Sequence, residues 1–110
     1  MEIDYINNKI KKQLSSATEI KKSFGVNAKK VSIRLSDMKA APNLAVLQKI
    51  PAANCHPLTG NRNGDWAVDI SPNHRLIFEI SHGPLPMTED GSIDTIRITD
   101  ITILKSEDYH

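Results

Sequence analysis

The start of the chain combines a short alternating segment with apolar residues at helical spacing. Residues 2–6 alternate polar and apolar side chains, which predicts a short strand with one buried face. From Ile6 to Phe24, apolar residues recur at steps of three and four, which predicts one interrupted helix or two. Ser16 and Glu19 have the spacing of a capping box, so a helix is expected to begin beside them.

A second amphipathic segment follows, and Asn27 is expected to cap its first turn. Its apolar stripe and the opposite basic face are Ala28, Val31, Leu35 and Met38 against Lys29, Lys30 and Arg34. Pro42 and Asn43 are expected to end this helix and to begin another turn or two. Beyond them, Pro51 and Pro57 favour extended chain, so the first half is predicted to be mainly helical.

The second half changes to a period of two. Residues 66–70 and 76–80 alternate in side-chain character, and the sequence Ser-Pro-Asn-His at 71–74 supplies turn residues between them. This pattern predicts an antiparallel hairpin. Residues 81–92 contain two glycines and two prolines, which is typical of a long loop.

A final strand is predicted after that loop. It is expected to run through Ile96, Ile98, Ile101 and Ile103. Because the apolar parity changes along this run, we expect either a bulge near Thr99 and Asp100 or a strand covered on both faces. Helices followed by a mainly antiparallel sheet predict an α+β fold, and 110 residues predict one domain covering 1–110.

Composition narrows the class of protein. The chain is 39% hydrophobic and 25% charged, which is typical of a globular domain. It has neither an apolar run long enough to cross a bilayer nor a signal-like start, and its single cysteine cannot form an internal disulfide, so a cytoplasmic protein without membrane contact is expected. Residues 1–49 carry a net charge of +6 and residues 50–110 a net charge of −5. The basic half suits either a nucleic-acid contact or a solvated helical surface.

The cysteine and the histidines do not have the spacing of a metal site. Cys55 and His56 are adjacent, whereas His74, His82 and His110 are scattered. A Gly-x-Ser-x-Gly elbow is also missing from the sequence. We therefore expect neither a metal nor another cofactor, and we expect Cys55 to be a small buried hydrophobic residue.

Two arginines are candidates for phosphate binding. The loop 60–64 is bounded by glycines and carries Arg62, so it can bring backbone N–H groups to a phosphate or simply connect two elements. Arg75 opens a predicted strand, where its guanidinium can bind a phosphate or form an ion pair with Glu79 or Asp69. Taken alone, each residue leaves both interpretations open.

Several short motifs become informative together. Taken singly, a histidine before a proline is usually a satisfied imidazole, and three terminal residues usually fray. The motifs are His56-Pro57-Leu58, Gly60, Arg62, Gly64, Trp66, Arg75-Leu76-Ile77-Phe78 and the final Glu107-Asp108-Tyr109-His110. Together they resemble the RelE/ParE toxin superfamily over essentially the whole chain, and the branch they resemble most is HigB.

The resemblance implies a fold of helices on a small curved, mainly antiparallel sheet. It implies a toxin of a type II toxin–antitoxin system that acts as an mRNA endonuclease in the ribosomal A site. The implied partners are therefore the ribosome, its mRNA and a HigA-like helix-turn-helix antitoxin.

The resemblance also implies a set of site residues. Carried over by position, the active-site set is His56, Arg75, Asp108, Tyr109 and His110, and the RNA contacts are Thr59 and Arg62. Metal-free cleavage of RNA needs a base for the 2′-OH proton, a cation for the charge growing on phosphorus, and an acid for the departing 5′-oxygen. His110 is expected to be the leading acid or base, with Asp108 or His56 as its complement. Tyr109 is expected to stack on or orient a base.

Two departures from the family pattern keep other functions open. Thr59 stands where these toxins often have a lysine, and the second half of the chain is acidic. One alternative is a ParE-like inhibitor of gyrase, which would act by binding a protein. The other is a catalytically weakened toxin homologue that serves as a binding or regulatory module.

Overall fold

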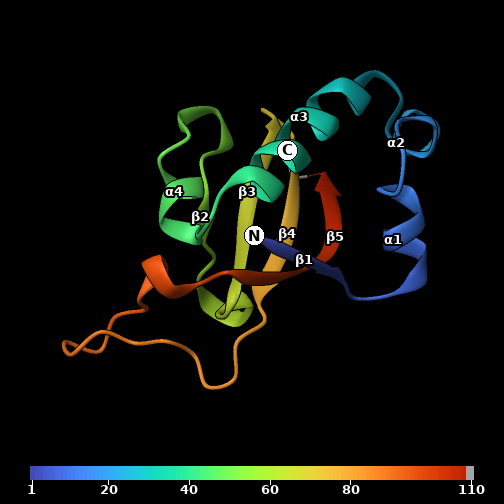
Figure 1. Ribbon diagram of the computed structural model, residues 1–110. Helices are drawn as coiled ribbons and strands as arrows, with labels where there is room; N and C mark the ends of the chain where they lie inside the picture. The colour runs from blue at the N-terminus through green and yellow to red at the C-terminus, as the bar shows by residue number, and fades with distance from the viewer. Residues whose placement is uncertain (109–110) are drawn as a thin grey trace.

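The helices lie against one face of a five-stranded sheet (Figure 1). The computed structural model describes residues 1–108. The helices are α1 (Asn8–Gln13), α2 (Ala17–Phe24), α3 (Ala28–Ala40) and α4 (Leu44–Gln48), and the strands are β1 (Glu2–Tyr5), β2 (His56–Pro57), β3 (Asp65–Ser71), β4 (His74–Ile80) and β5 (Asp100–Asp108). The strand order is β1-β5-β4-β3-β2, with β1 parallel to β5 and the other pairs antiparallel. The predicted α+β class is confirmed.

The helix starts follow from side-chain capping in all but one case. Ser16 accepts a hydrogen bond from the backbone N–H of Glu19 at 3.2 Å, and Asn43 accepts one from Val46 at 3.0 Å. The prediction for Asn27 is wrong, because its side chain makes no capping hydrogen bond with α3. The short 3₁₀ turn η1 (Gly25–Asn27) leads directly into α3, so the backbone there is already helical.

Arg34 does not lie on the exposed basic face of α3, where the sequence pattern had placed it. It is 7% exposed, and its guanidinium donates to the carbonyls of Asp69 and Ala52 and to the carboxylate of Asp37. A buried charge is tolerated when its donors are all directed at acceptors. Arg34 therefore fastens α3 to β3 and to η2 (Pro51–Ala53).

That 3₁₀ turn is a second correction, since Pro51 was expected to force extended chain. Proline has its φ fixed near the helical value and lacks an N–H group, so it fits the first position of a helical turn. Pro51 occupies this position in η2, and only Pro57 lies in a strand.

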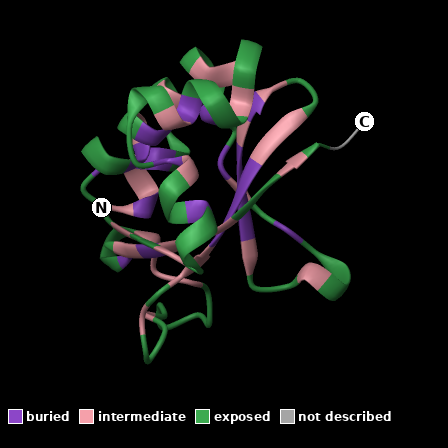
Figure 2. Ribbon diagram, turned by 90° about the vertical axis from the view of Figure 1, so that its right-hand side faces the viewer, coloured by how far each residue is buried: buried purple, intermediate pink, exposed green. Residues whose placement is uncertain are grey.

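The predicted hairpin of β3 and β4 is confirmed, and both of its faces carry buried apolar side chains. The main core lies between the helices and the sheet, where Figure 2 shows the buried residues gathered. A smaller apolar cluster of Leu58, Ala67 and Ile77, with Leu104 packed against it, lies apart from the main core. Ala67 and Ile77 are paired across the hairpin, so they share the sheet face opposite the helices.

The last strand begins later than predicted. Ile96 lies in the 3₁₀ turn η4 (Thr95–Arg97) and Ile98 precedes β5, so the parity change near Thr99 occurs before the strand and involves no bulge. The register shift falls instead opposite the Ile77/Phe78 step, where Ile77 pairs with Lys105 and Phe78 with Ile103, so that Leu104 is the extra residue.

The segment between β4 and β5 projects from the sheet as a long loop (Figure 1), as expected for residues 81–92. Among residues 1–108 the longest helix, α3, has 13 residues, and none of the helices could cross a membrane.

Candidate functional site

Three basic side chains surround the carboxylate of Glu107. Nη1 of Arg62 lies 2.7 and 2.9 Å from its two oxygens, and Nε and Nη2 of Arg75 lie 2.7 and 2.6 Å from Oε2. Nζ of Lys105 is 3.6 Å from Oε1. Burial by itself would raise the pKa of Glu107, but hydrogen bonds from Arg75 and Arg62 together with their positive charges lower it below its ordinary value. We call Arg62, Arg75, Lys105 and Glu107 the cationic cluster.

The cationic cluster lies on the sheet face away from the helices. Arg75 and Glu107 are directly paired across β4 and β5, and their neighbour Leu76 is buried in the main core. Because side chains alternate along a strand, the Arg75–Glu107 pair points to the opposite face. Arg62 reaches it from η3 (Gly60–Arg62), the loop that leads into β3. This arrangement brings Arg62 and Arg75, the two arginines singled out in the sequence, together through Glu107, a pairing that the sequence pattern does not predict.

His56 lies on the same face, two strands away. It pairs with Ala67, which in turn pairs with Ile77, two residues along β4 from Arg75. Sheet spacings place the Cα atoms of His56 and Arg75 about 12 Å apart. Nδ1 of His56 is 2.6 Å from the carbonyl oxygen of Asn54, which can only accept, so Nδ1 carries the proton and Nε2 is the acceptor.

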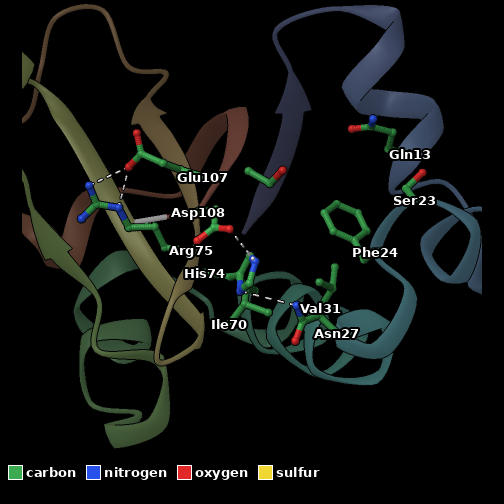
Figure 3. A pocket seen from close by; sticks show the side chains of 11 residues that line it. Gln13, Ser23, Phe24, Asn27, Val31, Ile70, His74, Arg75, Glu107 and Asp108 are labelled. Carbon is green, nitrogen blue, oxygen red and sulfur yellow. Dashed lines mark hydrogen bonds and ion pairs between the residues drawn. The ribbon is translucent and has the colours of Figure 1, made fainter. Parts of the chain in front are cut away.

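Asp108 points toward the helices, away from the cationic cluster. It pairs with His74, and Oδ2 of Asp108 lies 3.5 Å from Nε2 of His74 (Figure 3). The other ring nitrogen of His74 is 3.0 Å from the hydroxyl oxygen of Ser71 and 3.5 Å from the amide nitrogen of Asn27. The sequence pattern predicts His74 only as a turn residue. The signal that it had a further role was its position directly before Arg75 at the start of a strand.

Of the remaining predicted site residues, the structure describes Thr59 but not Tyr109 and His110. Thr59 is exposed immediately before η3, where its carbonyl accepts from the backbone N–H of Arg62 at 3.4 Å. Tyr109 and His110 lie outside the described residues, so their expected roles stay predictions. Residues 1–108 contain no cluster of three or more metal-ligating side chains.

The comparisons with known proteins bear on the fold. No protein-family model matches the sequence, and no curated protein matches it. Among solved structures, a YoeB/ParE toxin from Agrobacterium tumefaciens superimposes with a TM-score of 0.56 at 12% identity, and the match covers 100% of both chains. The chain shares the fold of a YoeB/ParE toxin. This likeness extends from β1 to β5 and agrees with the superfamily that the motifs resemble, whereas the HigB branch rests on the motifs alone.

Proposed function

We propose that this chain is the toxin of a type II toxin–antitoxin system, of the HigB-like branch, and a metal-free endonuclease of ribosome-bound mRNA. The proposal includes a HigA-like helix-turn-helix antitoxin as its partner, action in the cytoplasm, and a single domain over residues 1–110. The toxin-like fold and the motifs support the class. The chemistry of the sheet face away from the helices supports the activity.

The observation that carries the activity is the cationic cluster together with His56. Three cations meet one carboxylate on the sheet face away from the helices. The side chain of Arg75 is 14% exposed and its planar guanidinium is fixed in position by Glu107, as suits a group that must hold a phosphate without reorganising. In the neutral ring of His56, Nε2 is the nitrogen that can accept a proton on the same face.

These groups suit cleavage through the neighbouring 2′-OH. Nε2 of His56 takes the 2′-OH proton, the 2′-oxygen attacks the adjacent phosphorus, and the 5′-oxygen leaves with a proton from an acid. Arg75 and Arg62 stabilise the charge that develops on the phosphoryl oxygens. We assign the acid to His110, the leading candidate of the predicted C-terminal group, because Asp108 faces away from the cationic cluster.

A second candidate function is a ParE-like inhibitor that acts by binding a protein. The observation that favours it is Glu107, because its carboxylate already satisfies both Arg62 and Arg75. A phosphate would have to displace Glu107 or share the arginines with it, whereas a protein partner needs no such exchange.

The test is induced expression in a bacterial host followed by mapping of mRNA 5′ ends. We expect new 5′ ends within codons, lost in Arg75→Ala and reduced at least about a hundredfold in His56→Gln. Arg97→Ala is the matched control, because Arg97 is an exposed arginine in η4 that is paired with Asp94. Growth arrest that persists in His56→Gln without new 5′ ends would support the inhibitor and overturn the nuclease.

A further inference from the structure

A pocket of about 340 Å³ lies on the helix side of the sheet, at the end of β4 and β5 (Figure 3). Its floor is apolar. Val31 and Ile70 are 1% and 6% exposed and belong to the main core, and the partly buried ring of Phe24 packs against that core. Such a floor suits one flat, poorly hydrated ring.

The rim of the pocket is polar and ordered. His74 is held by Ser71 and Asn27. The amide nitrogen of Asn27 can only donate, so in the neutral ring of His74 Nδ1 accepts and Nε2 carries the proton, on the side of Asp108. Gln13 and Ser23 also line the pocket, and their side chains make no hydrogen bond with any residue in 1–108.

Asn27 connects the rim of the pocket to the start of α3. It occupies the N-cap position of α3, where an asparagine side chain normally accepts a hydrogen bond from the helix backbone. Here the side chain turns to His74 instead, 47 residues away in the sequence. Because η1 has already made the backbone helical at this point, the side chain of Asn27 is available to orient His74.

We infer that this pocket holds one unpaired nucleobase of the RNA, stacked on Phe24 with its polar edge toward His74, Asn27 and Gln13. Amide and imidazole groups supply both donors and acceptors, as a base edge requires. Helices α1 and α2, which supply Gln13 and Ser23 to the pocket, carry more exposed lysines than acidic residues; these are Lys9, Lys11, Lys12, Lys21 and Lys22 against Glu19. The inference rests on the proposed function, and the two sites adjoin at the start of β4, where His74 of the pocket is followed directly by Arg75 of the cationic cluster.

The test uses a probe that cannot be cleaved, so that binding is measured separately from activity. Isotope-labelled full-length protein is titrated with the 2′-O-methyl trinucleotide of adenosine, and amide chemical shifts are followed. We expect saturable shifts at Phe24, Asn27 and His74. Phe24→Leu, which keeps an apolar side chain but removes the ring, should weaken binding about tenfold. Val26→Ala is the control, since Val26 is 99% exposed on the same turn and does not line the pocket.

A second variant and a second probe complete the binding experiment. If Phe24→Leu lowers the melting temperature markedly, Asn27→Ala replaces it, with a weakening of several fold expected. Adenosine monophosphate should bind at least about tenfold more weakly than the trinucleotide, because it lacks the neighbouring phosphates that basic side chains contact. Equal affinity would identify a free nucleotide and overturn the RNA assignment.

Different results would contradict the base-pocket inference and the nuclease proposal. Shifts confined to the face of Arg62 and Lys105, or unchanged affinity in Phe24→Leu, would overturn the base pocket while leaving the proposed function intact. Absence of Arg75-dependent mRNA cleavage would overturn the nuclease, whatever the trinucleotide shows.

Discussion

Glu107→Gln is the substitution that probes the cationic cluster most directly. Glu107 is 19% exposed and accepts hydrogen bonds from two arginines, each of which is itself half-buried. A hydrogen bond to a charged group contributes about 1.5–3 kcal/mol, and partial solvent exposure reduces this. Glutamine keeps one acceptor oxygen but loses the charge, so we expect the free energy of unfolding to fall by about 2 kcal/mol, with a melting temperature about 8 °C lower.

The effect should depend on pH with a defined sign. The arginines lower the pKa of Glu107 in the folded protein, so its contribution is fully present above the unfolded pKa of about 4.3 and is lost as the pH falls through the lower folded value. The difference between wild type and Glu107→Gln should therefore be constant from pH 7 to pH 5 and should shrink toward pH 3.

Urea denaturation across this pH range, followed by circular dichroism, measures the difference. Glu79→Gln is the matched control, because Glu79 lies on the same face of β4 and has no ion pair with any residue in 1–108. If Glu107→Gln stays within about 0.5 kcal/mol of wild type, or if the difference grows as the pH falls, the cluster does not stabilise the fold as described.

Two further predictions concern the interior. Arg34→Met should lower the free energy of unfolding by about 3 kcal/mol, because it leaves the buried carbonyls of Asp69 and Ala52 without their donor. Lys30→Met, on the exposed face of α3, is the control and should change it little. Equal effects of the two substitutions in urea denaturation would contradict the role of Arg34. Burial raises the pKa of Cys55 to about 12, so its alkylation by iodoacetamide at pH 8 should be at least about a hundredfold slower in the native protein than in urea, and similar rates would show that the thiol is accessible.

Local patterns predicted the elements better than they predicted the site. The hairpin, the Ser16 cap and the α+β class follow from spacing over a few residues, and all three are confirmed. The prediction for Arg34 was wrong because helical spacing cannot show that acceptors from distant segments, the carbonyls of Asp69 and Ala52, converge on this position. His74 was missed for the same reason, since Asn27 and Asp108 approach it from elements far apart in the sequence.

The sequence by itself determined the residue types, the order of helices and strands, and the short-range turns and caps, because these depend on backbone preferences and on neighbours within one or two turns. Only the tertiary structure decided which side chains share a face. The bulge at Leu104 is the clearest case, because Ile101 and Ile103 face the helices while Lys105 and Glu107, after the extra residue, face the other way. Strand register follows from how β5 packs between β4 and β1, and it is this register that joins Glu107 to Arg75 and Asp108 to His74.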